Sequence, residues 1–392
     1  MSNKQTFKSH FSRSLKAHDD TLHFAAHSHH FWPDVSFEGH VEAWEVAAAK
    51  SDRKWDHVYG AVIPELRAEL ASLLNVSASE RFVFAPNTHE FVLRLLSCLS
   101  HDVIPHVVSS DQEFHSFSRQ MARLVEDGLA KWTQVAAEPF ESFEARWSAA
   151  LAGGADLAFL SQVPFSSGYA WPSLDALCTV AVDAGAMMVV DGYHGFCARP
   201  TDMAALQTRV FYMSGGYKYA MSGEGCCFLY VPPSADGLRP RNTGWFAAFD
   251  ALGDAQTGVV YGPAAGAFWG ATYDPSGLYR MRRVLQWMRA EGISPDLVQR
   301  RSQAFGAQLV EALQGSDWAH VPLVVSPSSE QRGSFLCFVV PEAARVVKAL
   351  AERGVQVDAR GDRLRVGFGL YHDADDVAAL ARIMRQVALT SP

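Results

Sequence analysis

The chain has 392 residues, of which 48% are hydrophobic and 19% charged, and its 34 basic and 42 acidic side chains give a formal charge of −8. These proportions are typical of a folded globular protein of two or three domains, and they exclude a disordered tail or a single small module. The basic residues form no clustered patch, so we expect no nucleic acid partner.

The targeting and redox signals of the sequence are those of a soluble protein. The six cysteines are scattered without a C-x-x-C pair, which favours a reducing compartment. The first twenty residues hold no apolar run of the signal-peptide type, and no later window approaches 18 consecutive apolar residues. We therefore expect a cytoplasmic protein that does not contact a membrane.

Helical and β-rich segments alternate through the first two thirds of the chain. Apolar residues at helical spacing predict helices over 65–74 and 92–99, and a third over 173–184 that ends at Gly185. Short β-rich runs predict strands at 81–85, 107–110, 157–160, 187–190, 210–214 and 226–231. Strand, helix and strand in succession predict an α/β domain built on a mostly parallel sheet of about seven strands, covered on both faces.

A smaller α+β domain is predicted at the C-terminal end. Helices are expected over 278–290, 302–313, 342–353 and 374–389, and strands over 335–340 and 363–368. We therefore divide the chain into three parts. Residues 1–50 are an N-terminal segment that contributes to the small domain and the active site, 51–265 the large cofactor-binding domain, and 266–392 the small domain.

An acid and a lysine follow two successive strands of the predicted sheet. Asp191 and His194 come directly after the strand 187–190, and Lys218 follows the next strand between glycines and aromatic residues. Ligands of open α/β sheets bind beyond the carboxyl ends of the strands. Pyridoxal phosphate needs a lysine amine to hold it covalently and a carboxylate to keep its ring nitrogen protonated. The pair of Asp191 and Lys218 therefore predicts this cofactor.

Two further segments complete a site of that kind. Asn87, Thr88, His89 and Glu90 open the helix after the strand 81–85, where free backbone N–H groups can bind a phosphate. Phe114 or His115 can lie flat against the cofactor ring. Each residue also has an ordinary alternative, namely a helix cap for Asn87 with Glu90, a core position for Phe114 and a solvated surface for Lys218.

With these residues in view, the chain resembles the fold-type-I, pyridoxal-phosphate-dependent enzymes of the class V aminotransferase group, and within that group the kynureninases. The resemblance runs from about residue 82 to residue 379. It is carried by Tyr217-Lys218-Tyr219, Gly244-Trp245-Phe246, Gly270-Ala271-Thr272, Arg332-Gly333-Ser334 and Leu364-Arg365-Val366-Gly367-Phe368, which leads into Leu370-Tyr371.

The resemblance implies a role for each residue at a matching position. Lys218 is then the lysine that carries the cofactor, Asp191 binds its ring nitrogen and His194 lies near its phenolic oxygen. The phosphate is bound by Tyr217, Thr88 and His89, the ring stacks on Phe114, and Gln162 belongs to the cofactor site. Trp245 and Thr272 reach the phosphate of a neighbouring subunit, which implies a homodimer with shared sites.

The substrate side is implied in the same way. Arg365 resembles the arginine that pairs with the α-carboxylate of an amino-acid substrate, a role that suits its planar fork of donors. The alternative is a surface ion pair of Arg365 with Asp358 or Asp362. The kynureninase reading implies hydrolytic cleavage of the Cβ–Cγ bond of kynurenine or a related β-acyl alanine.

Other reactions remain open at this stage. Transamination, or elimination and desulfuration of another amino acid, uses the same cofactor. A cysteine desulfurase needs a mobile loop cysteine, whereas Cys337 and the pair Cys226-Cys227 lie in or beside predicted strands. A catalytically silent binding protein is disfavoured because Asp191 and Lys218 are both present, and such a buried pair is costly to keep without a ligand.

The N-terminal segment departs from the kynureninase pattern. It has Ala26-His27-Ser28-His29-His30 where kynureninases have an Asn-Ser-Leu-Gly type of turn near the substrate, so His27, His29 and His30 become candidate substrate contacts. Pro164 and Phe165 replace polar residues beside the cofactor, where Gln162 and Ser167 can compensate. A metal-dependent hydrolase built on His27 and His29 is the competing function from another class, although no second set of ligands at a matching spacing is evident and we expect no metal.

Overall fold

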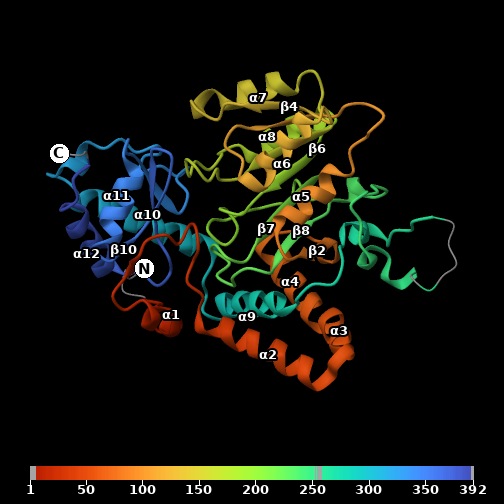
Figure 1. The fold of residues 1–392 in the computed structure, drawn as a ribbon, viewed down its shortest axis with the longest axis horizontal. Coiled ribbons are helices and arrows are strands. Elements are labelled where there is room, and N and C mark those ends of the chain that lie inside the picture. The colour runs from red at the N-terminus through yellow and green to blue at the C-terminus, as the bar shows by residue number, and fades with distance from the viewer. Residues whose placement is uncertain (1–5, 252, 254–257, 390–392) are drawn as a thin grey trace.

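A seven-stranded sheet forms the centre of the larger part of the chain in the computed structural model, which describes residues 6–251, 253 and 258–389 (Figure 1). The strands follow the order β2-β8-β7-β6-β5-β3-β4, and every neighbouring pair is parallel except those of β8, which runs antiparallel to β7 and β2. This arrangement confirms the predicted mostly parallel α/β sheet. The strands are β2 (Phe82–Ala85), β3 (His106–Ser110), β4 (Lys131–Val135), β5 (Leu157–Ser161), β6 (Met187–Asp191), β7 (Val210–Gly215) and β8 (Cys227–Tyr230).

Helices cover this sheet and connect its parallel strands. Helix α8 packs on β6 and against α7, while α5 packs on β2, β7 and β8 and against α6. Because helices lie over the sheet, its central strands are apolar without alternation, and β2, β5, β7 and β8 are buried along their full length. The helices of this part are α3 (Lys54–His57), α4 (Ile63–Leu74), α5 (Thr88–Leu96), α6 (His115–Glu126), α7 (Phe143–Leu151) and α8 (Leu174–Asp183).

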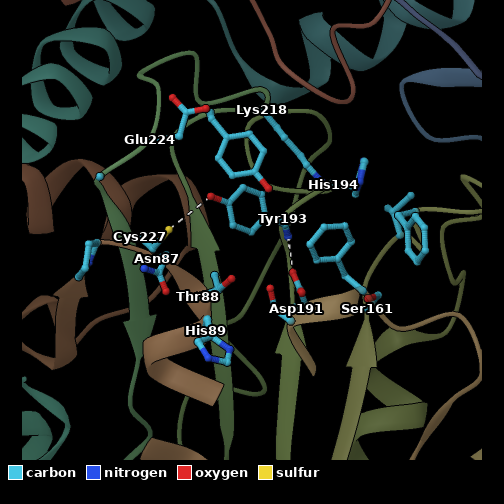
Figure 2. Close-up of a pocket in the computed structure, with 17 residues that line it drawn as sticks. Asn87, Thr88, His89, Ser161, Asp191, Tyr193, His194, Lys218, Glu224 and Cys227 are labelled. Carbon is cyan, nitrogen blue, oxygen red and sulfur yellow. Dashed lines mark hydrogen bonds between the residues drawn. The ribbon is translucent and has the colours of Figure 1, made fainter. Parts of the chain in front are cut away.

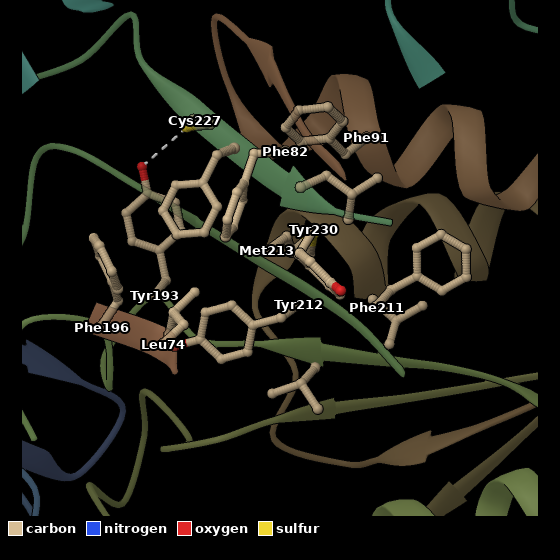
Figure 3. Packing of buried hydrophobic residues seen from close by; sticks show 14 of the residues in the cluster. Leu74, Phe82, Phe91, Tyr193, Phe196, Phe211, Tyr212, Met213, Cys227 and Tyr230 are labelled. Carbon is tan, nitrogen blue, oxygen red and sulfur yellow. Dashed lines mark hydrogen bonds between the residues drawn. The ribbon is translucent and has the colours of Figure 1, made fainter. Parts of the chain in front are cut away.

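Apolar and aromatic side chains fill the space between the sheet and these helices. Phe82 of β2 packs edge-on against Tyr230 of β8, with ring centroids 5.2 Å apart, and Phe211 and Tyr212 come from β7 (Figure 3). The hydroxyl of Tyr193, just beyond β6, lies 3.3 Å from the sulfur of Cys227 in the same cluster. The core therefore extends to the edge of the sheet at which the candidate site lies.

Two long helices lie side by side across the lower edge of the molecule as drawn in Figure 1, namely α2 (Asp34–Lys50) and α9 (Ser276–Ala290). Their backbones approach closely at Gly39, where an added Cβ would meet the carbonyl oxygen of Tyr279 at 2.8 Å. A residue without a side chain is therefore required at this crossing. The predicted helix over 278–290 corresponds to α9, whereas α2 was not predicted.

A smaller unit is built from the C-terminal residues together with the start of the chain. Strands β11, β12 and β9 form an antiparallel three-stranded sheet, and β1 pairs in parallel with β10. The elements are α1 (Ser12–Ala17), β1 (Leu22–His23), α10 (Pro295–Ala312), β9 (Phe335–Val339), α11 (Ala343–Ala351), β10 (Val355–Gln356), β11 (Asp358–Arg360), β12 (Arg363–Gly367) and α12 (Ala374–Met384). Short 3₁₀ or π turns occupy Lys8–Phe11, Ser51–Arg53, Val58–Val62, Ser79–Arg81, Phe140–Ser142, Pro233–Ala235, Trp245–Ala251, Ala264–Phe268 and Asp317–His320.

The two units have separate hydrophobic cores, and the residues of these cores bear on where the domains divide. The buried side chains of α9 and Val298 of α10 belong to the core of the large unit, which also includes Leu370 and Tyr371 from the segment after β12. The second core begins at Phe305 and also contains Phe24 from the N-terminal segment. We therefore propose that the small domain begins within α10. Within the described part of the chain, no helix has both the length and the apolar composition needed to cross a membrane.

Candidate active site

The carboxyl ends of five strands meet at one edge of the large sheet and border a single cavity. Strands β2, β3, β5, β6 and β7 all run toward this edge, and the antiparallel β8 starts there with Cys227. The cavity has a volume of about 330 Å³ (Figure 2). It is lined by Pro86, Asn87, Thr88, His89, Phe114, Ser116, Ser161, Val163, Phe165, Asp191, Tyr193, His194, Tyr217, Lys218, Glu224, Gly225 and Cys227. Seven of the residues predicted to bind the cofactor therefore line this one cavity.

The amine of Lys218 is buried inside this cavity. Lys218 follows β7 and is 6% exposed, and its Nζ lies 2.5 Å from Nε2 of His194. Burial lowers the pKa of Lys218 to about 7, although the nearby carboxylate of Asp191 acts in the opposite direction. Burial, together with the charge of Lys218, also holds the pKa of His194 well below its usual value. A neutral imidazole therefore faces an amine that loses its proton near neutral pH.

The carboxylate of Asp191 ends strand β6 in the wall of the same cavity. It is 8% exposed and accepts a hydrogen bond of 2.9 Å from the backbone N–H of Tyr193. Burial raises its pKa, while the Tyr193 N–H and the charge of Lys218 act to lower it. A buried carboxylate of this kind is stabilised when a cationic partner is placed next to it.

The first turn of helix α5 lines part of the cavity. Asn87 caps the helix, because its side chain accepts a hydrogen bond from the backbone N–H of Glu90 at 3.1 Å, so the predicted cap is confirmed. The side chain of Glu90 forms an ion pair with Arg94, one turn later. Thr88 and His89 begin the helix and line the cavity, where the positive end of the helix dipole favours an anion.

Aromatic rings surround the lysine amine. The Nζ of Lys218 lies 5.5 Å from the ring centroid of Phe114, 5.1 Å from that of Tyr193 and 5.7 Å from that of Tyr217. Phe114 is the residue before α6, and of the two rings considered for the flat contact it is the one that lines the cavity. These rings offer flat apolar faces to a planar ligand.

Three predicted cofactor residues lie outside the cavity lining. The amide of Gln162 faces β7, where its oxygen accepts from Tyr212 and its nitrogen donates to Thr201. Trp245 is 44% exposed, and Thr272 is exposed at the surface. The predicted contact of Trp245 and Thr272 with a neighbouring subunit therefore stays a prediction, and both side chains are accessible for it.

Arg365 is not among the residues that line the cavity, and it forms a buried ion pair. Its Nε donates to Oδ1 of Asp358 at 2.9 Å, its Nη2 donates to Oδ2, and its Nη1 donates to the carbonyl oxygen of Phe165 at 2.6 Å. The alternative pairing with Asp358 is thus present, but the arginine is only 2% exposed, so the pair is not the weak surface contact that the sequence suggested.

The three candidate histidines of the N-terminal segment have different surroundings. His27 is fully buried and its Nε2 donates to Asp358 at 2.8 Å. His29 is exposed and stacks on Tyr217, while His30 is buried with its Nδ1 2.6 Å from the carbonyl oxygen of Phe31. No group of three or more possible metal ligands exists among the residues the structure describes. His27 and His29 therefore do not combine into the metal centre that the competing hydrolase would need.

Buried neutral histidines make the fold sensitive to acid. Burial lowers the pKa of His23 to about 3 and those of His27 and His30 to about 4. In the unfolded chain these histidines take up a proton below about pH 6.5, whereas in the folded chain they stay neutral until about pH 4. The stability of the fold is therefore unaffected by these histidines above pH 6.5 and falls as the pH drops toward 4. At pH 5 each of these histidines lowers the free energy of unfolding by about 2 kcal/mol relative to its value at neutral pH.

We expect urea unfolding to show this loss between pH 7 and pH 5. The buried carboxyl of Glu113 acts in the opposite direction, because burial raises its pKa to about 7 and its protonation in the fold offsets part of the loss. His30→Gln should therefore remove one histidine's contribution, about 2 kcal/mol, from the loss of unfolding free energy between pH 7 and pH 5. It should also lower the stability at pH 7. Equal pH slopes for the two proteins would contradict the assignment of the loss to buried histidines.

Several lining residues were not predicted from the sequence. Ser161 is paired with Asp191 across the ends of β5 and β6, and its hydroxyl donates to the buried carboxylate of Glu113 at 2.5 Å. Tyr193 and Glu224 also line the cavity. The signal for Ser161 was its place directly after a predicted strand, which is the same signal that singled out Asp191.

Comparison with known proteins identifies similar chains. Residues 298–384 match the family model of the kynureninase C-terminal domain. A kynureninase of Pseudomonas fluorescens is 27% identical over 239 residues, which are 58% of this chain and 55% of that protein, so the match spans about half the length of this relative.

Solved structures with the same fold cover nearly the whole chain. A cysteine desulfurase from Thermococcus onnurineus NA1 aligns over 98% of this chain and 99% of its own, with a TM-score of 0.81 and 18% identity. A variant of C-DES, with glycine covalently linked to its pyridoxal phosphate cofactor, aligns over 97% of this chain and 99% of its own, with a TM-score of 0.82 and 16% identity.

Proposed function

We infer that this chain, a kynureninase-like protein with the fold of the class V aminotransferase group, is an enzyme that binds pyridoxal phosphate through Lys218 and acts on an amino acid. The observation that carries this inference is the placement of the Lys218 amine, the Asp191 carboxylate and the first turn of α5 around one buried cavity. The similar structure of a C-DES variant, in which glycine is covalently linked to pyridoxal phosphate, supports it.

The residues of the cavity fit the cofactor. Nδ1 of His194 is buried and has no hydrogen-bond partner among the described residues, so a ligand oxygen can provide one. Asp191 offers a carboxylate to a protonated ring nitrogen, Phe114 a face to the ring, and Thr88 with His89 the backbone N–H groups for the phosphate. When bound, pyridoxal phosphate supplies an electron sink for negative charge on the carbon next to the substrate nitrogen.

The side chains of the cavity move the proton, orient the lysine amine and exclude water. Lys218, whose pKa is about 7, can accept a proton from the substrate carbon and return it, because its amine is neutral in a large fraction of molecules at neutral pH. His194 accepts a hydrogen bond from this amine and keeps it oriented. The rings of Phe114 and Tyr193 exclude water from the side of the amine that they cover.

The reaction we propose is the hydrolytic cleavage of the Cβ–Cγ bond of kynurenine or a related β-acyl alanine. It is supported by the kynureninase match of residues 298–384 and by the similarity to a kynureninase over 239 residues. The cofactor-loaded protein incubated with L-kynurenine or its 3-hydroxy form should release alanine and an anthranilate. If these ligands perturb the visible absorbance of the protein but yield no anthranilate, the cofactor assignment stands and this reaction is rejected.

A lyase or desulfurase is the second candidate, because the structures similar over nearly the whole chain include a cysteine desulfurase and C-DES. Among the described residues the cysteines are buried, apart from the half-buried Cys98, and burial raises the pKa of Cys98 and of Cys337 to about 12. Such thiols are poor acceptors of sulfur, which favours the first candidate over a desulfurase. Incubation with cysteine and assay of sulfide and pyruvate tests for the lyase.

We also propose that the active protein is a homodimer. Trp245 and Thr272 are at the surface, as expected of residues that reach a neighbouring subunit. Light scattering of the purified protein should give about twice the mass of one chain, and a monomer that retains activity would reject shared sites.

A substitution at the phosphate end tests the cofactor's orientation. Thr88→Val removes a hydroxyl in the first turn of α5 and keeps the shape of the side chain. We expect about tenfold weaker binding of pyridoxal phosphate, because one hydrogen bond to a charged group is lost, whereas binding of pyridoxal without the phosphate should be unchanged. Both affinities can be measured by absorbance titration. Equal weakening of the two would place Thr88 away from the phosphate.

A further inference from the structure

We propose that Asp358 is a specificity-determining residue, which weakens the binding of a substrate carboxylate by occupying the side of the Arg365 guanidinium. The proposal rests on the proposed function and on the role that the resemblance to kynureninases implies for Arg365, namely a contact with the α-carboxylate of an amino acid. It goes further by assigning a function to Asp358 and, through it, to the buried His27.

The ion pair is built into the small sheet. Asp358 of β11 and Arg365 of β12 are direct cross-strand partners, so their side chains share one face. Nε and Nη2 of the arginine both donate to this carboxylate, and Nη1 donates to the carbonyl oxygen of Phe165. All three nitrogens of Arg365 are therefore engaged. Asp358 also forms an ion pair with Arg360, whose Nη2 lies 3.8 Å from Oδ2, so this one carboxylate faces two guanidinium groups.

His27 fixes the other side of the carboxylate. Its ring is completely buried and its Nε2 donates to Asp358 Oδ1, the same oxygen that accepts from Arg365 Nε. Burial opposes ionisation of Asp358, but His27 and Arg365 hold the pKa of this carboxyl well below its usual value. Asp358 therefore keeps its negative charge throughout the physiological pH range, and both of its neighbours hold it in place.

This pair lies close enough to the lysine amine to act on a bound amino acid. The charge of Arg365 contributes to the lowered pKa of both Lys218 and His194. Phe335 contacts both Arg365 and His194, because its ring centroid is 5.7 Å from Cζ of Arg365 and 5.7 Å from the ring centroid of His194. Arg365 also donates to the carbonyl oxygen of Phe165, a residue that lines the cavity. A carboxylate next to the substrate nitrogen would therefore experience Arg365 and Asp358 together.

The two charges act on such a carboxylate in opposite directions. Arg365 attracts it and Asp358 repels it, and at similar distances the two Coulomb energies are of similar size. A substrate amine that carries no carboxylate experiences neither interaction. The substrate carboxyl group therefore adds less to affinity than it would if the charge of Asp358 were absent, and removing that charge should make it add more.

Asp358→Asn tests this prediction, because asparagine keeps the size of the side chain and loses its charge. L-kynurenine and kynuramine differ only by the carboxyl group, and L-alanine and ethylamine form a second matched pair. Their dissociation constants are measured from the visible band of the protein loaded with pyridoxal phosphate. We expect the preference for the acid over the amine to rise about tenfold or more in both pairs, with amine binding changed by less than about twofold.

Controls separate the charge effect from damage to the fold. Glu138→Gln makes the same chemical change in the partner of Arg363, which lies two residues from Arg365 on β12, and should leave the preference unchanged. Asp358→Ser is a second neutral variant for use if the asparagine variant does not fold, and Asp358→Glu keeps the charge and should keep the wild-type preference.

The outcomes also separate this proposal from the proposed function. If a neutral variant binds the cofactor normally but shows an unchanged or lower preference for the acids, Asp358 only positions Arg365 and the proposal is overturned. If the wild-type protein takes up no pyridoxal phosphate, the proposed function fails, and the inference that rests on it fails as well.

Discussion

Lys218→Ala is expected to abolish the visible band of the protein loaded with pyridoxal phosphate and to lower turnover at least about 10³-fold. Lys218 is the buried amine at the end of β7, and its Nζ lies among the rings of Phe114, Tyr193 and Tyr217. Without this amine the cofactor has no covalent attachment, and the substrate carbon has no base within reach. The band is measured by absorbance after dialysis, and turnover by release of the amino-acid product.

The control for this experiment is Lys348→Ala, which removes an exposed lysine from α11 and should change neither quantity. Thermal unfolding of the Lys218→Ala variant should occur at or above the wild-type temperature when both proteins are free of cofactor, because burial of the lysine amine costs stability. A variant that keeps its visible band after dialysis would show that another residue holds the cofactor.

Asp191→Asn is expected to lower turnover about 100-fold or more while leaving the protein folded. The carboxylate ends β6, is 8% exposed and faces the cavity beside Lys218. An amide of the same shape cannot balance a positive charge, so the ring nitrogen of the cofactor would lose its proton and the electron sink would weaken. Single-turnover kinetics with the amino acid that perturbs the band measures the loss at the chemical step.

Asp183→Asn serves as the matched control, since it removes the charge of an exposed aspartate at the end of α8. Binding of pyridoxal phosphate should weaken in the Asp191 variant and be unaffected in the control. A binding loss without any loss in the rate of the chemical step would mean that Asp191 only anchors the cofactor.

Most residues of the candidate site were predicted from their position at or just after the end of a predicted strand. Asp191 ends β6 and Lys218 follows β7, and because parallel strands meet with their carboxyl ends at one edge, side chains that are distant in the sequence were expected to come together. Thr88 entered by the same reasoning, as the first residue of a helix that follows a strand. These predictions needed only local patterns and the geometry of an α/β sheet.

Features that depend on contacts between distant segments could not be read in this way. The helix α2 has no continuous apolar stripe, and it is held against α9 by a close backbone contact at Gly39 that a sequence pattern does not show. Arg365 has two carboxylates nearby in the sequence, and its choice of Asp358 follows from the cross-strand register of β11 and β12. Asp358 of that pair also accepts a hydrogen bond from His27, which is far from it in the sequence.

The parallel pairing of β1 with β10 has a consequence for the way the chain is made. Leu22 and His23 are synthesised long before Val355 and Gln356, which lie opposite them in the parallel register of β1 and β10. The large sheet between them can form first, since its strands lie within residues 82–230. The N-terminal segment must therefore wait through most of translation before it can dock, so its apolar side chains, among them Phe24, remain exposed to chaperones and to aggregation during that interval.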